Sequence, residues 1–245
     1  MADWIGYQWL AARFCVSPVQ AFRKDSAIAR SRATVQEDGY VHEYYPPAAK
    51  PDDDLPSHLT FALKHEGVHL EFLARLFDAI PVAELDAWIA AEPTGQYARR
   101  AGFFYEYLTG RQLAFPGVVA GNYVVALDED EYLTATEAVN NPRWRVRDSL
   151  PGTRDYCPLV SRTLRVRQAE QYDCAKHLAD LEAEFGSDVL QRSVVWLTIK
   201  ESRASFAIEH EEQHVDRVRR FASVMEQGCG QYDEPLSDAV LSELQ

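Results

Sequence analysis

Apolar side chains recur at intervals of three and four residues through much of the chain, and this spacing predicts amphipathic helices. We expect one helix over residues 57–79, with Ser57 as a suitable N-cap. Its recurring apolar positions are Leu59, Leu63, Leu70, Leu73 and Phe77. The same spacing predicts two further helices, over residues 82–91 and 95–108, which Pro93 separates.

Helical spacing returns after residue 165. The segment QAEQYDCAKHLADLEAEF predicts a helix that ends at Gly186, because glycine suits the C′ position. The next helix has Ser187 as its N-cap and runs toward Glu209, and a further helical segment reaches Gly228. The last residues, EPLSDAVLSELQ, have the pattern of a helix opening. We therefore expect the chain either to stop within a larger structure or to end in a frayed helix.

Strand-like alternation of apolar and polar residues stands out in one place, SRATVQEDGYVHEYYPP. It predicts a β-hairpin in which Gly39 supplies the positive φ of the turn. The first 20 residues predict a short helix stopped at Ser17 and Pro18. Residues 111–164 contain prolines, glycines and short apolar runs, so we expect mostly loop there, with a few extended pieces.

These patterns together predict a mainly α protein, with a small N-terminal β-hairpin and a long irregular middle segment. The expected divisions are an N-terminal helix and hairpin over residues 1–50, a helical region followed by a long loop-rich segment over 51–164, and C-terminal helices over 165–245. All three can belong to one domain.

Composition narrows the class of protein. Hydrophobic residues make up 47% and charged residues 26% of the 245-residue chain, as in an ordinary globular protein. The sequence has no apolar run of about 18 residues and no basic start before an apolar stretch, so we expect neither a membrane partner nor secretion. A cytoplasmic location with reduced thiols also fits the scattered cysteines, which are Cys15, Cys157, Cys174 and Cys229. The net charge of −13 opposes binding to nucleic acid.

Two short strings have the spacing of zinc ligands: HEGVH at His65 to His69, and HEEQH at His210 to His214. Histidines four apart on a helix can share a metal, and the glutamate after the first can act as a general base toward bound water. A catalytic zinc needs a third protein ligand. For the first string the acidic candidates in later helices are Glu84, Glu92 and Glu106.

The chemistry around both strings favours another interpretation. Glu212 and Gln213 give the second string a solvated turn, and Gly67 weakens a helix through the first. We therefore disfavour a metal at His65, His69, His210 and His214, and interpret His65 and His69 as partly buried histidines that contact carboxylates or carbonyls. A single structural metal site shared by the two strings has no further support in the sequence.

The segment TIKESRASFAIEHEEQHVDRVRRFASVM resembles the region just before the catalytic core of Fic-family proteins, which transfer AMP from ATP to protein hydroxyls. In that family an inhibitory helix carries Ser or Thr, three residues, Glu, then Gly or Asn. Ser205 and Glu209 match this pattern, and His210 departs from its last position. The segments HLTFALKHEGVHLEFLARLF, EPTGQYARRAGFFYEYLTG and NPRWRVRDSLPGTRDYCP extend the resemblance to the N-terminal region of a bacterial Fic subgroup.

The resemblance implies an inhibitory role for Ser205 and Glu209, which are four residues apart and share one face if the helix continues through both. In the family the glutamate forms an ion pair with an arginine of the catalytic loop that otherwise holds the ATP γ-phosphate. A carboxylate can compete for a guanidinium group in this way because it offers the same paired oxygens as a phosphate.

The family's catalytic loop, which begins with HPF and continues to GNGR, does not occur in these 245 residues. We therefore expect no catalytic residue and no cofactor in this chain, whereas ATP and Mg²⁺ are implied for a separate catalytic core. The expected partners are that core, in cis or in trans, a protein substrate and, as a further option, a second copy of the chain. The alternatives are a zinc-binding or metallopeptidase-like protein, and a free-standing antitoxin-like inhibitor or interaction scaffold.

Overall fold

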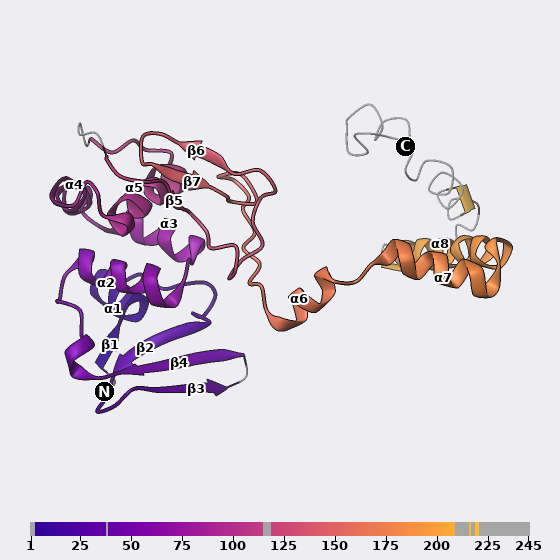
Figure 1. Cartoon of the computed structure of the whole chain (residues 1–245), viewed down its shortest axis with the longest axis horizontal. Helices are drawn as coiled ribbons and strands as arrows, with labels where there is room; N and C mark the ends of the chain where they lie inside the picture. The colour runs from indigo at the N-terminus through magenta and orange to yellow at the C-terminus, as the bar shows by residue number, and fades with distance from the viewer. Residues whose placement is uncertain (1–2, 38, 115–118, 209–215, 217–218, 221–245) are drawn as a thin grey trace. The chain divides into compact units, whose positions relative to one another are not determined.

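The computed structural model in Figure 1 describes residues 3–37, 39–114, 119–208, 216 and 219–220. The chain divides into two compact units, Met1–Gln168 and Ala169–Gln245, which are called unit 1 and unit 2 below. Within the described residues, the structure has no helix that is both long enough and apolar enough to cross a membrane.

Unit 1 has three layers, in which helices lie between two small sheets (Figure 1). The strands are β1 (Asp3–Ile5), β2 (Lys24–Ile28), β3 (Ala33–Glu37), β4 (Tyr40–Tyr45), β5 (Val124–Val125), β6 (Val139–Asn141) and β7 (Val146–Asp148). The helices are α1 (Tyr7–Phe14), the 3₁₀ turn η1 (Pro47–Ala49), α2 (Leu55–Phe61), the π-helical turn η2 (Ala62–Glu66), α3 (Leu70–Ala79), α4 (Val82–Ala91) and α5 (Gln96–Thr109).

The prediction of a mainly α fold is wrong, because the protein is a mixed α/β structure. One sheet has the strand order β1-β2-β4-β3, and a second has the order β5-β7-β6. The predicted hairpin is confirmed: β3 and β4 pair antiparallel, and Gly39 has a φ of 84°. The other strands were missed because they are short or polar. β1 has three residues, and the sequence of β2 is KDSAI.

The helix predicted over residues 57–79 is interrupted in the structure. α2 ends at Phe61, the chain passes through η2, and Gly67 then turns away with a φ of 90° before α3 begins. The N-cap of α2 is Asp54, whose Oδ1 accepts a hydrogen bond from Ser57 N at 2.8 Å, so Ser57 is not the cap. The break matters because it changes which side chains of the segment HEGVH share a face.

The core of unit 1 lies where α3 and α5 pack together. Phe72, Leu73 and Leu76 of α3 have no exposed surface, and neither does Phe104 of α5. The middle segment covers α5 from the other side through Trp144, which is also fully buried. The small second sheet therefore closes the apolar core and is not a loose surface loop.

Unit 2 is built from helices that expose most of their apolar side chains. α6 (Leu164–Glu170) leads into it, followed by α7 (Cys174–Phe185) and α8 (Ser187–Ile208). The predicted helix end at Gly186 is confirmed, and the Asp173 side chain caps α7 by accepting from Lys176 N. α8 begins at Ser187, which is its first residue and not the predicted N-cap. α7 and α8 contact each other, but no residue of α7 is buried.

Gly102 in α5 lies directly against the ring of Trp144. A Cβ at this position would stand 2.5 Å from Trp144 Cζ3, which is far inside contact distance. Gly102→Ala should therefore lower the free energy of unfolding by about 1–3 kcal/mol, the usual cost of an overpacked core. Glycine to alanine in an unobstructed helix would raise it by about 0.4–1 kcal/mol. Urea unfolding measures the change in the free energy of unfolding that Gly102→Ala causes. This change should be smaller when Trp144 is also replaced by Phe. An equal cost in both backgrounds would exclude the ring as the cause.

Candidate functional site

The C-terminal half of α8 contains the first half of the proposed inhibitory motif. α8 is a continuous helix from Ser187 to Ile208, and it places the backbone of Ser205 in its last turn. Glu209, His210 and His214 lie outside the described residues. The ion pair implied for Glu209 therefore stays a prediction.

One face of α8 leads along the helix to Ser205. Val194 and Thr198 precede Ser205 by eleven and seven residues, so at 3.6 residues per turn all three lie on one side of the helix. Val194 is 59% exposed and Thr198 is partly exposed. This face, defined by Val194, Thr198 and Ser205, is called the Ser205 face below.

The opposite side of α8 also carries exposed apolar groups. An open hollow of ≈ 520 Å³ is lined by Val189, Arg192, Ser193, Trp196 and Leu197. Trp196 is 64% exposed, and Lys200 Nζ lies 5.3 Å from the centre of its ring. Soluble proteins seldom leave several large apolar side chains open on a short helical pair unless another surface covers them.

The first zinc-like string does not form a helical pair of histidines. His65 is in η2, whereas His69 follows the break at Gly67 and acts as the N-cap of α3, where its Nδ1 accepts a hydrogen bond from Phe72 N at 3.2 Å. The ring of His65 packs instead against Phe61, with 4.7 Å between ring centres. Burial lowers the pKa of both histidines.

The glutamate of this string has a structural position inside unit 1. Glu66 Oε2 accepts a hydrogen bond of 2.7 Å from Tyr7 N, the first residue of α1. The carboxyl group lies so close to Gly6 that a Cβ there would be 2.3 Å from Oε2. Tyr7 in turn donates its hydroxyl to Gly67 O at 2.8 Å. Glu66 thus caps a helix from a distant part of the chain, and this contact joins α1 to the end of η2.

Burial raises the pKa of Glu66 to about 8, and the Tyr7 N–H and the nearby Ser26 hydroxyl offset only part of this rise. Glu66 Oε1 and Ser26 Oγ are buried, and neither makes a hydrogen bond of good geometry. The structure contains no ion pair to Glu66 among its described residues. Lys24 lowers the pKa of Glu66 less than burial raises it, so the neutral carboxylic acid is the favoured form near pH 7.

His58 provides the second remote cap of α1. It has no exposed surface, and its Nδ1 accepts a hydrogen bond from Gly6 N at 3.2 Å. Trp9 stacks on the imidazole with ring centres 3.9 Å apart and an angle of 1°. Burial lowers the pKa of His58 to about 4, so the neutral ring is the form that fits this environment.

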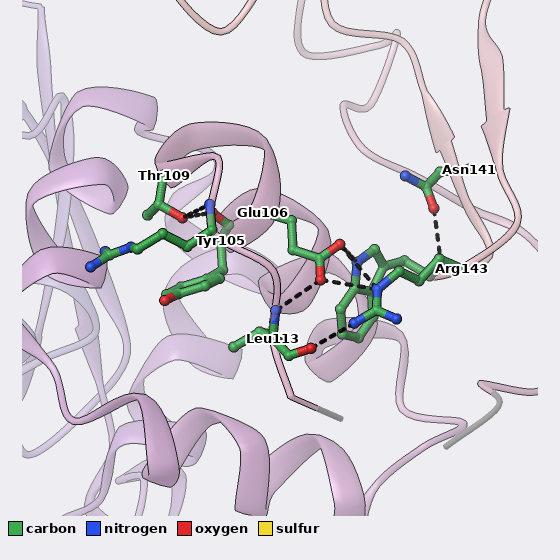
Figure 2. A network of polar contacts seen from close by, with 8 residues as sticks. Tyr105, Glu106, Thr109, Leu113, Asn141 and Arg143 are labelled. Atoms are coloured by element: carbon green, nitrogen blue, oxygen red, sulfur yellow. Dashed lines mark hydrogen bonds and ion pairs between the residues drawn. The ribbon is translucent and has the colours of Figure 1, made fainter. Parts of the chain in front are cut away.

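Glu106, one of the three acidic candidates for a third metal ligand, is engaged in a different network (Figure 2). Its Oε1 accepts from Leu113 N at 3.0 Å, and Arg143 Nε contacts both oxygens at 2.9 and 3.1 Å. Its Oε2 also accepts from Trp144 Nε1 at 2.8 Å. These contacts fasten the middle segment to α5. Glu84 and Glu92 are exposed. Within the described part of the chain, no three His, Cys, Asp or Glu side chains are grouped so that they could hold a metal ion.

Sequence reasoning missed the remote capping of α1, although a signal was present. The residue before α1 is Gly6, which has no side chain to cap the helix, and no Ser, Thr, Asp or Asn stands next to it. The first N–H groups of such a buried helix need partners from elsewhere, so a distant acceptor was to be expected. Which residue would supply it depends on the tertiary fold.

Comparisons of the chain with protein-family models, with curated proteins and with solved structures found no match.

Glu66 should make the stability of unit 1 depend on pH. Its folded-state pKa of about 8 lies above the ordinary value of 4.5, so the folded state holds the proton more tightly. The stabilisation is fully present below about pH 4.5 and is lost as pH rises through about 8. Between pH 6.5 and 8 the free energy of unfolding should fall by up to about 1.4 kcal/mol per pH unit.

Urea unfolding of the wild type and of Glu66→Gln at pH 6.5 and 8.5 measures this dependence. The glutamine amide has the shape of the neutral acid but does not titrate. The free energy of unfolding of the variant should therefore fall much less between these two pH values. His58 makes stability rise with pH mainly between its folded pKa of about 4 and its ordinary value of 6.5, and it contributes equally to both proteins in this comparison. Parallel curves for the two proteins would contradict a buried, titrating Glu66.

Proposed function

We propose that this chain is the N-terminal regulatory part of a Fic-type AMP-transferring enzyme, and that Glu209 restrains a catalytic core supplied in cis or in trans. In this proposal the Glu209 carboxylate pairs with a catalytic-loop arginine and keeps the ATP γ-phosphate from its productive position. ATP and Mg²⁺ belong to the core, and a protein hydroxyl is the acceptor of AMP.

The observation that supports the proposal best is the surface of α8. The helix is continuous to Ile208, the residue before Glu209, and in the proposal its Ser205 face meets the catalytic core. Val194 on that face is exposed, and so is Ile208, at 82%. A helix that acts by lying against a catalytic loop needs such an uncovered side, because its apolar groups gain burial only when the core is present.

The cysteines and the surroundings of Glu66 are also compatible with the proposal. The three described cysteines, Cys15, Cys157 and Cys174, are free thiols, in keeping with the cytoplasmic location that we include in the proposal. The residues around Glu66 serve the internal structure of unit 1, since one oxygen of its carboxyl group caps α1 and the other is buried. No observation in the described chain favours the metallopeptidase alternative over the regulatory one.

The proposal predicts that removing the Glu209 carboxylate activates the core. Glu209→Gly and Glu209→Gln should raise AMP transfer by about 10- to 150-fold, the range expected when a charged hydrogen bond of about 1.5–3 kcal/mol is lost. The measurement is incorporation of labelled AMP by a Fic core that is joined to this chain or mixed with it.

Glu184→Gln is the matched control, because Glu184 is an exposed glutamate of α7, outside the Ser205 face, and the change removes the same charge. It should leave AMP transfer unchanged. Equal rates for the Glu209 variants and the wild type, with a catalytic core that demonstrably binds the chain, would contradict the inhibitory role.

The Val194→Asp variant tests the Ser205 face. If this variant no longer binds the catalytic core, the result supports the Ser205 face as the contact, whereas unchanged binding would argue against it.

A further inference from the structure

Strand β3 forms an open edge of the four-stranded sheet in unit 1. The order β1-β2-β4-β3 leaves β3 with a neighbour on one side alone, and Figure 1 shows it as the outermost strand. All five residues from Ala33 to Glu37 are exposed. A strand in this position presents a row of backbone donors and acceptors that can pair with another strand.

The hydrogen bonds of β4 define which groups of β3 face outward. Val41 N donates to Arg23 O, and Tyr45 O accepts from Ala29 N, both at 2.8 Å, so the odd-numbered residues of β4 bond toward β2. The even-numbered residues of β4 therefore bond toward β3, where their partners are Ala33, Val35 and Glu37. The backbone groups of Thr34 and Gln36 consequently point away from the sheet.

This edge carries one charged side chain, Glu37, but lacks other features that keep edge strands apart. The sequence ATVQE contains neither lysine nor proline, and the pairing of β3 with β4 runs without a bulge. Val35 is 44% exposed at the centre of the strand. Trp4 and Tyr40 are 38% and 41% exposed. The register of the four strands places both on the same face of the sheet as Val35, because side chains alternate between the two faces along each strand.

We propose that β3 is the contact between two copies of this chain, which join their sheets through an antiparallel β3–β3 pair. A two-fold axis at Val35 lets Thr34 of each copy exchange hydrogen bonds with Gln36 of the other. Val35 then faces Val35 of the second copy in a non-hydrogen-bonded pair, in which the Cα atoms are about 4.5 Å apart. The exposed apolar faces of both sheets become continuous.

Charge explains why a second copy fits this edge. Arg30 and Arg32 precede β3, which ends at Glu37, and all three residues are exposed. In the proposed register Glu37 opposes Ala33 of the second copy, the residue next to Arg32. Arg32 lies 3.6 Å from Glu43 of its own sheet, whereas Arg30 and Glu37 form no ion pair within the described part of the chain. Antiparallel pairing brings the basic end of one strand to the acidic end of the other at both ends of the contact. An unrelated strand would need this same order of charges, whereas a second copy has it by symmetry.

A cysteine placed on the axis tests the register. In a background with the four native cysteines replaced by serine, Val35→Cys should form a disulfide-linked dimer on mild oxidation, because a Cα separation of about 4.5 Å permits the bond. Glu37→Cys is the matched control on the same strand and face. In the proposed register it opposes Ala33 of the second copy, about 13 Å from the other cysteine, and it should not cross-link.

Light scattering at increasing protein concentration tests the dimer itself. The wild type should show a concentration-dependent dimer, and Val35→Lys should weaken it at least tenfold, because two ammonium groups would meet at the axis. Val19→Lys is the control, since Val19 is a 71% exposed valine outside the sheet. A monomer at every concentration, equal cross-linking of the two cysteine variants, or equal effects of the two lysines would each overturn the proposal.

Discussion

The carboxyl group of Glu66 holds together parts of unit 1 that are distant in sequence. It accepts the backbone N–H of Tyr7 at the start of α1, and it packs against Gly6 in a space that no other residue type would leave open. Ser26 of β2 lies beside it, and Gly67 turns the chain away directly after it. This contact therefore joins the first sheet, α1 and the end of η2. The π-helical turn at Ala62–Glu66 brings the carboxyl group there, and such turns are uncommon outside sites with a particular geometric need.

The two units differ in how they bury apolar side chains, and this difference connects the fold to the proposed function. Unit 1 encloses most of its large apolar side chains between helices and two sheets, although Val19, Val139 and Tyr156 are among those that it leaves exposed. The described helices of unit 2 leave Leu178, Phe185, Trp196 and Leu197 at least half exposed. Covering those side chains with another protein surface would release water from them, which is the dominant favourable term in most protein associations. A regulatory helix that meets a separate catalytic core has this property.

Part of the fold could be predicted from the sequence because local chemistry decides it. Gly39 determines the hairpin turn, and Gly186 followed by Ser187 ends one helix and starts the next. The first sheet could not be predicted in full, because β1 and β2 are held by partners far along the chain and their own sequences carry little alternation. The break at Gly67 was missed for a related reason. Apolar spacing continues across it, although the backbone does not.

The same limit applies to the candidate sites. The string HEGVH suggested two histidines on one helical face, but tertiary contacts give His69 a capping role and enclose Glu66. The Ser205 motif is different, because the spacing of its side chains depends only on a continuous helix and not on tertiary contacts. α8 provides that helix up to Ile208, and Glu209 lies outside the described residues.

Hydrogen exchange of this chain with and without a Fic-type catalytic core tests the central claim most directly. The account predicts that the core slows exchange in the C-terminal half of α8, around Val194 to Ile208, and leaves the interior of unit 1 unchanged. Exchange in α8 that is the same with and without a bound core would contradict the account.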